Sequence, residues 1–134
     1  MKFIIMLTIV IGLALADFIT GVIKAALKKD VSSQMMRTGG LHKIMEVTVM
    51  LTACGLEFGI GVLGNYYNEP RLAEITGIFT SGTVFVWIVF MEITSILENY
   101  LESNPKAKWA RWLLKRLRVF QQNETKEDKD DSAD

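Results

Sequence analysis

The chain has 134 residues, of which 50% are hydrophobic and 22% are charged, and its formal net charge at pH 7 is zero. This length predicts one domain, and so apolar a composition requires the charges to be segregated from the hydrophobic runs. The balanced total excludes no class of partner, because it averages basic and acidic regions that lie apart in the sequence. An intrachain disulfide is excluded, because Cys54 is the only cysteine; we expect it to be a small packed thiol.

The first hydrophobic segment, residues 3–23, would form a helix of about 31 Å, which is enough to cross a bilayer. Residues 1–16 also resemble a secretory signal peptide that ends at Ala14-Leu15-Ala16. We favour an uncleaved span, because the apolar run resumes after Asp17. The end of this span is amphipathic, and its polar sector is either a seam between helices or an inert interfacial stripe. That sector contains Asp17, Thr20, Gly21, Lys24 and Lys28.

Residues 28–43 are predicted to form a loop or a short surface helix, interrupted at Gly39-Gly40. The segment is basic and contains His42, the only histidine of the chain. A metal ion needs three or four convergent ligands, and the sequence places none around His42, so we interpret it as an interfacial residue. We expect neither a metal nor any other cofactor.

Residues 44–63 form the second predicted span, and its helix has two different faces. Glu46 and Glu57 are three turns apart and share one face. Acidic side chains at membrane depth indicate a functional role by default. The opposite face is a ridge of small side chains that would permit close packing with another helix. This small-residue ridge consists of Thr48, Thr52, Gly55 and Gly59.

A turn at Asn68-Glu69-Pro70 leads into the third predicted span, residues 75–100. This span is longer than a bilayer requires, so it either tilts or follows a re-entrant turn through Thr76-Gly77 and Ser81-Gly82. Its second half carries one polar sector about 80° wide. A charge in this sector that faced lipid would cost about 2.5–3.5 kcal/mol, so the sector requires partners or water. Its members are Glu92, Ser95, Asn99 and Glu102.

After the third span, Asn104-Pro105 is typical of a helix start. Residues 105–120 are predicted to form a basic amphipathic helix that lies on an anionic membrane surface. The side chains expected at that surface are Lys108, Trp109, Arg111, Trp112, Lys115 and Arg118. Residues 121–134 carry six acids and two lysines, and this composition predicts a disordered tail.

The distribution of cations predicts the orientation in the membrane. The first loop and its borders hold five Lys and Arg residues, the second loop holds one, and the region after the third span holds six. Positive residues favour the cytoplasmic side, so the N-terminus should lie outside and the C-terminus in the cytoplasm. The predicted fold is therefore an all-α integral membrane protein, with a three-span membrane domain over residues 1–104.

The residues offer no catalytic arrangement, because the single Cys and the single His lie in different environments and no serine has a histidine partner. An enzyme is not expected. Each span instead offers a polar sector that one three-helix monomer could hardly hide, so we expect a homo-oligomer in which these sectors meet each other or line water. The predicted intramembrane seam consists of Asp17, Lys24, Glu46, Glu57, Glu92, Ser95 and Asn99.

The order of several segments resembles the toxin-secretion/phage-lysis holin family of Gram-positive phages and their clostridial relatives. The resemblance covers about residues 1–120 and is carried by these segments: Asp17-Phe18-Ile19-Thr20-Gly21, Lys28-Lys29, Ser32-Ser33, Lys43, and Glu92-Ile93-Thr94-Ser95-Ile96-Leu97-Glu98-Asn99. It implies a protein that accumulates in the cytoplasmic membrane and then abruptly forms holes that release an endolysin or a toxin. The positions that match the family motif are Asp17, Gly21, Glu92, Ser95, Glu98 and Asn99. Lys2 and Met6 also resemble the two-start arrangement of some holins, in which the shorter form would lose Lys2.

Three other functions fit the same sequence. A holin inhibitor, or antiholin, would have nearly the same sequence features but would delay lysis. A small ion- or proton-coupled transporter or channel would use the same intramembrane carboxylates. A membrane scaffold would assemble through the small-residue ridge and conduct nothing.

Overall fold

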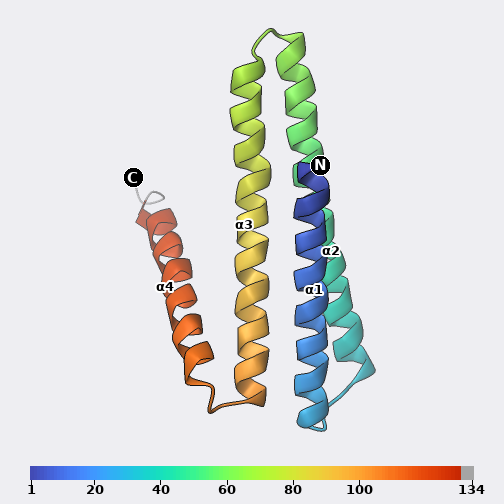
Figure 1. Ribbon diagram of the computed structural model, residues 1–134, viewed down its shortest axis with the longest axis vertical. Coiled ribbons are helices and arrows are strands. Elements are labelled where there is room, and N and C mark those ends of the chain that lie inside the picture. Colours follow the sequence, from blue (N-terminus) through green and yellow to red (C-terminus); the bar gives the residue numbers. More distant parts are fainter. Residues whose placement is uncertain (131–134) are drawn as a thin grey trace.

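Within residues 1–130, the computed structural model contains four helices, and it describes the surroundings of side chains as far as Val119. They are α1 (Lys2–Leu27), α2 (Ser33–Tyr66), α3 (Pro70–Ser103) and α4 (Lys108–Asp130). Helices α2 and α3 form a long antiparallel hairpin, α1 lies along it, and α4 folds back beside α3 (Figure 1). The N-terminus lies well short of the hairpin turn, so the tip of the hairpin extends beyond α1.

Helices α1, α2 and α3 are each long and apolar enough to cross a membrane. Their outward side chains are largely apolar; Ile4, Phe58 and Phe79 are 69%, 68% and 74% exposed. In water such a surface would be unstable, whereas hydrocarbon solvates it. The predicted all-α fold with three spans is therefore confirmed.

The prediction of a loop or a broken surface helix over residues 28–43 is wrong in part, because α2 already begins at Ser33 and runs unbroken through Gly39-Gly40. The Ser32 side chain caps its first turn by accepting a hydrogen bond from Met35 N at 3.2 Å. The Cβ position of Gly39 lies 3.9 Å from the ring of Phe18 on α1. Gly39 therefore faces α1, and α2 stays continuous here although each glycine disfavours a helix by roughly 1 kcal/mol.

The third span is one continuous helix, so the alternative of a re-entrant turn through Gly77 and Gly82 is not realised. Asn68 takes the left-handed conformation that closes the turn, at φ 60°, and Pro70 occupies the first turn of α3. Gly77 serves packing instead. A Cβ there would lie 2.8 Å from Glu57 Cγ on α2.

The close contact between α2 and α3 uses glycines that differ from the predicted ridge. At Gly64, a Cβ would lie 2.1 Å from Ala73 Cβ, so no larger residue fits without a shift. By contrast, Cβ atoms at Gly55 and Gly59 would meet no described atom within 4 Å. The small-residue ridge is therefore left on the outside of this pair.

The hydrophobic core has two parts. Between the three long helices lie Val10, Met50, Cys54 and Ile88. The predicted packed thiol is confirmed, since Cys54 is buried. Between α3 and α4 lie Leu97, Ala107, Ala110 and Leu114.

The predicted start of the last helix at Asn104-Pro105 is wrong by three residues. Asn104 instead ends α3, and its carbonyl accepts a hydrogen bond from Ala107 N at 3.1 Å, which makes a turn before α4. Helix α4 also continues to Asp130, past the predicted end at residue 120. The last part of the predicted disordered tail, residues 131–134, lies outside the described residues.

Candidate functional site

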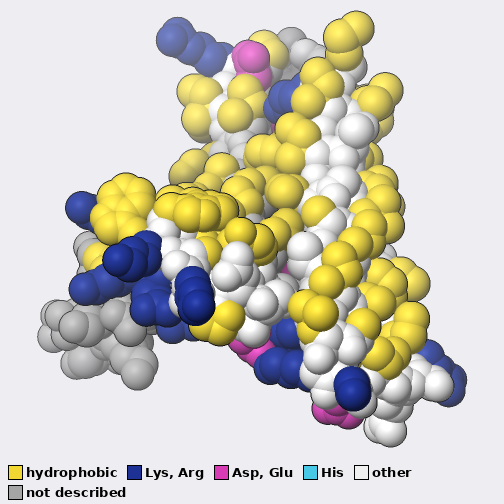
Figure 2. Space-filling view, turned by 60° about the horizontal axis from the view of Figure 1, so that its bottom comes forward, with side chains coloured by type: hydrophobic (Ala, Val, Ile, Leu, Met, Phe, Trp, Pro, Cys, Tyr) yellow, Lys and Arg dark blue, Asp and Glu magenta, His cyan; other side chains and the backbone are white. Residues whose placement is uncertain are grey.

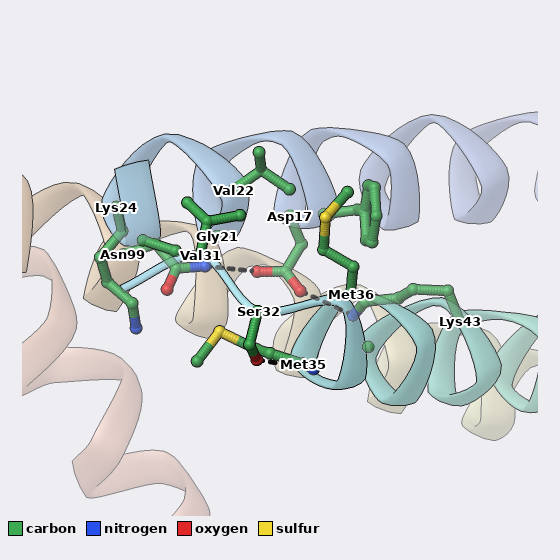
Figure 3. Close-up of a pocket in the computed structure, with 13 residues that line it drawn as sticks. Asp17, Gly21, Val22, Lys24, Val31, Ser32, Met35, Met36, Lys43 and Asn99 are labelled. Atoms are coloured by element: carbon green, nitrogen blue, oxygen red, sulfur yellow. Dashed lines mark hydrogen bonds and ion pairs between the residues drawn. The ribbon is translucent and has the colours of Figure 1, made fainter. Parts of the chain in front are cut away.

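One lysine of α2 contacts carboxylates from all three long helices. Lys43 Nζ lies 2.8 Å from Asp17 Oδ2 on α1, and Figure 3 shows this contact. It also donates to both carboxylate oxygens of Glu92 on α3, each at 2.8 Å, and lies 3.3 Å from Glu46 Oε2 on its own helix. Asp17 is 7% exposed and Glu92 is 1% exposed. We call these four residues the Lys43 cluster.

The convergence follows from the spacing along α2. Lys43, Met50, Cys54 and Glu57 follow one another at intervals of seven, four and three residues, which places them in one stripe of a helix. That stripe faces the interior, because Met50 and Cys54 belong to the core. Lys43 was not among the predicted seam residues, because the predicted loop ended there. The stripe becomes visible in the sequence only when the helix starts at Ser33.

An amide continues the cluster between α1 and α3. Asn99 Nδ2 donates to Asp17 Oδ1 at 3.0 Å and lies 3.4 Å from Thr20 Oγ1. The Cβ position of Gly21 is 3.6 Å from the same amide nitrogen, so the small residue lets α3 approach here. Asp17 therefore has one oxygen on an ammonium and the other on an amide (Figure 3), as a buried carboxylate requires.

A second polar group lies nearer the hairpin turn. Glu57 accepts hydrogen bonds from Lys2 at the start of α1 and from Ser81 on α3. We call these three residues the Glu57 cluster. Lys43 and Glu57 are about 21 Å apart along the axis of α2, at 1.5 Å per residue. The predicted acidic face of α2 thus points inward, but Glu46 and Glu57 belong to different layers.

The core of Val10, Met50, Cys54 and Ile88 separates these two layers. The separation of about 21 Å is smaller than the roughly 30 Å of bilayer hydrocarbon. The Lys43 cluster and the Glu57 cluster are therefore two separate polar groups with an apolar plug between them. This arrangement of a single chain provides no continuous polar path across the membrane.

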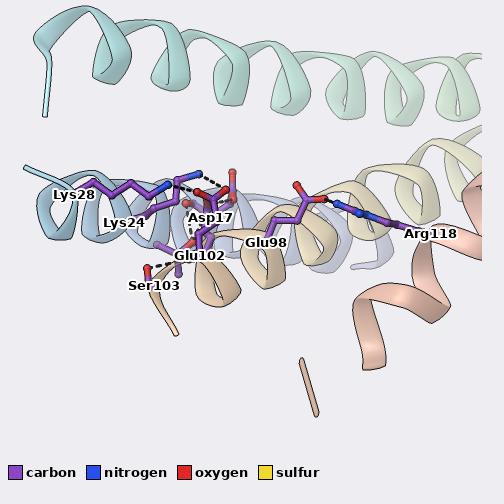
Figure 4. A network of polar contacts seen from close by, with 9 residues as sticks. Asp17, Lys24, Lys28, Glu98, Glu102, Ser103 and Arg118 are labelled. Carbon is purple, nitrogen blue, oxygen red and sulfur yellow. Dashed lines mark hydrogen bonds and ion pairs between the residues drawn. The ribbon is translucent and has the colours of Figure 1, made fainter. Parts of the chain in front are cut away.

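A third set of contacts lies near the loop between α1 and α2 (Figure 4). The Glu102 carboxylate forms ion pairs with Lys24, at 3.3 Å, and with Lys28. Glu98 pairs with Arg118 of α4 at 2.6 Å. These side chains are partly exposed, and such pairs contribute little to stability.

The structure brings together some of the residues that were predicted to form an intramembrane seam. Asp17, Glu46, Glu92 and Asn99 come together, whereas Glu57 and Lys24 make separate contacts and Ser95 lies half-buried on α3. The partners that hold the acids were not predicted, namely Lys43, Lys2 and Ser81. No periodicity within one helix reveals a contact between helices.

The chemistry of the Lys43 cluster is that of a charged network, with three carboxyl groups around one ammonium. Taking such charges out of water costs several kcal/mol per ion, and only good pairing offsets that cost. Any change that separates the helices leaves these groups unpaired unless water reaches them. Among the described residues, no group of three or more His, Cys, Asp and Glu side chains could hold a metal ion.

Three helices that can cross a bilayer, with a charged network buried among them, define a multi-pass membrane protein. Residues 2–122 match the bacteriophage holin family, and the chain belongs to that family. The family is of a non-enzymatic, pore-forming kind. Comparisons with curated proteins and with solved structures gave no match.

Proposed function

We propose that this chain is a holin that oligomerises in the cytoplasmic membrane of a bacterial host and opens lesions that release an endolysin or a toxin. The observation that carries the proposal is the Lys43 cluster. It stores charged side chains inside a bundle whose outer surface is apolar. A water-filled lesion needs a polar lining, and this cluster is the polar surface that the spans can offer.

The mechanism is an exchange of partners. In the single chain, Asp17 and Glu92 are satisfied by Lys43, and the apolar plug keeps the two polar layers apart. When helices of several chains rearrange, the same side chains can turn to water without loss of polar contacts, because hydration replaces the ion pairs. The protein can thus accumulate without conducting and then open.

Assembly is supported by the small-residue ridge. Gly55 and Gly59 have open space at their Cβ positions, and Thr48 and Thr52 are exposed. In hydrocarbon, helix pairing depends on close van der Waals packing, which such a ridge permits. We propose that the ridge of one copy packs against a second copy.

We propose that the N-terminus lies outside and the C-terminus in the cytoplasm. The loop between α1 and α2 and the start of α4 lie at the same end of the molecule (Figure 1). Both segments are basic. The turn between α2 and α3 has no Lys or Arg of its own, and the nearest cation in the sequence is Arg71 at the start of α3. The positive-inside rule then places the basic end in the cytoplasm.

Inducible expression in a bacterium tests the function, with turbidity and membrane potential recorded together, with and without a co-expressed cytoplasmic endolysin. We expect a lag, then sudden depolarisation, and lysis that requires the endolysin. Steady growth with an intact potential would contradict the proposal. Graded ion flux without cell death would indicate a channel or transporter, and delayed lysis on co-expression with an active holin would indicate an antiholin.

A further inference from the structure

The apolar side of α4 is divided between two environments. Ala110 and Leu114 are buried against Leu97 of α3. Trp109 and Trp112, which the sequence places on the same apolar side, are instead 60% and 62% exposed. The buried contact with α3 uses Ala110 and Leu114. Both indole rings stay largely exposed, although the Trp109 ring also touches Tyr100 of α3, with 5.5 Å between ring centroids.

The exposed rings lie among cations. Arg116 lies over the ring of Trp112, with 5.4 Å from its guanidinium carbon to the ring centroid. Lys108 and Lys115 are exposed on the same helix. In Figure 2, hydrophobic side chains and dark blue Lys and Arg side chains gather together on the arm that α4 forms. Residues 108–119 contain five cations and no acid.

The depth of this surface follows from its neighbours on α3. The pair between Arg118 and Glu98 and the contacts of Glu102 with Lys24 lie along the last two turns of α3, at the end of the predicted span. Ion pairs that are partly exposed mark the level where the helix leaves the hydrocarbon. Tryptophan rings prefer this level, since one edge is apolar and the N–H can reach water or headgroups.

We propose that the face of α4 formed by Trp109 and Trp112 with Lys108, Lys115 and Arg116 docks on the headgroups of anionic phospholipids. The rings enter the boundary between headgroups and acyl chains, and the cations meet the lipid phosphates. Charge complementarity selects an anionic lipid, because a zwitterionic surface offers these three cations no net attraction. Docking would fix the end of α3 relative to the bilayer. The proposal does not depend on hole formation.

Tryptophan fluorescence of the full chain in vesicles tests this surface. Replacing Trp87, which lies on α3, by Phe leaves Trp109 and Trp112 as the reporters. The Trp87→Phe protein is reconstituted into phosphatidylcholine vesicles and into vesicles of phosphatidylcholine and phosphatidylglycerol in equal parts, each with and without brominated lipid. In the anionic vesicles we expect emission at shorter wavelength and quenching at least about twofold stronger, with both gains reduced at high salt.

A matched pair of variants separates this surface from general basicity. Lys108→Gln with Lys115→Gln removes two cations from α4 and should abolish most of the gain in quenching. Lys29→Asn with Arg37→Gln removes two cations from the same end of the molecule, away from α4, and should keep the gain. Asn is chosen at position 29 because φ there is 56°, a left-handed conformation that Asn adopts more readily than most residues.

Three results would overturn the proposal. Equal emission and quenching in both kinds of vesicle would mean that anionic headgroups are not recognised. An equal loss in both variants would mean that α4 is not the surface. A gain in quenching that appears only after removal of residues 121–134 would mean that the acidic segment, not lipid, occupies the face of Trp109 and Trp112. Dye retained in the same vesicles during the measurement separates docking from lesion formation.

Discussion

The Lys43 cluster and the Glu57 cluster are the two polar layers of the bundle. Both pair a lysine with carboxylate, but they differ in how deeply the charged groups are buried. In the Lys43 cluster, one ammonium meets three carboxyl groups, and Glu92 is almost fully buried. In the Glu57 cluster, one carboxylate meets Lys2, whose side chain is 48% exposed, and the hydroxyl of Ser81. Both layers join all three long helices, but the second does so through Lys2 at the very start of α1. Burial, and not the number of charges, should decide which layer controls opening.

The largest effect is expected at the centre of the Lys43 cluster. Lys43→Met leaves the carboxylates of Asp17 and Glu92 buried without a counter-charge, and the loss of one partner of a buried pair costs about 3–5 kcal/mol. Thermal unfolding in detergent should show this loss, and lysis should begin earlier at equal abundance in the membrane. Arg37→Met, at an exposed position of the same helix, is the control. An unchanged melting temperature for Lys43→Met would show that the cluster does not hold the bundle.

A smaller loss is expected from crowding next to the Glu57 cluster. In Gly77→Ala, the new methyl would lie 2.8 Å from Glu57 Cγ and 3.3 Å from the Glu57 carbonyl oxygen. Such overpacking costs about 1–3 kcal/mol. Gly82→Ala is the matched control, because its Cβ would meet nothing within 4 Å, and a more stable helix is expected there. Equal melting temperatures of the two variants would contradict the close approach of α2 and α3.

The two layers can be compared directly through their glutamates. Glu92→Gln and Glu57→Gln each remove one negative charge with little change of shape, and both should shift the triggering time or the size of the oligomer. We expect the larger shift for Glu92→Gln, since its carboxylate is the more deeply buried. Lysis timing at equal membrane abundance and cross-linking of the oligomers measure the two quantities. Timing that stays unchanged in both variants would exclude the polar groups from the mechanism.

The smallest effect on folding is expected at the end of the chain. Deleting residues 121–134 removes six acids and two lysines but none of the residues of the two layers. Insertion and the melting temperature should be unchanged, while the triggering time changes because the charge at the end of α4 changes. Membrane fractionation and lysis curves of the truncated protein test this. A truncated protein that failed to reach the membrane would show that the segment has more than a regulatory role.

The predictions that succeeded rest on local properties. Three apolar runs of bilayer length and an amphipathic basic segment are properties of single helices, and each was identified without knowledge of its neighbours. The errors lie where a neighbour decides. Gly39-Gly40 was interpreted as a break, yet α2 runs through both residues, and Gly39 faces Phe18 of α1. A re-entrant turn through Gly77 was one of two alternatives for the third span, yet Gly77 is a contact site for Glu57.

The sequence by itself determined that this chain is a three-span membrane protein with acids at membrane depth, because hydrophobic length and charge are written into each segment. Only the tertiary structure decided which cation each acid meets. Lys43 is distant in sequence from Asp17 and Glu92, and only the packing of α1 and α3 around α2 brings their charges within 2.8 Å of it. The same packing filled the space between the layers of Glu46 and Glu57 with Val10 of α1 and Ile88 of α3. Contacts of this kind depend on the relative placement of helices, which no single helix encodes.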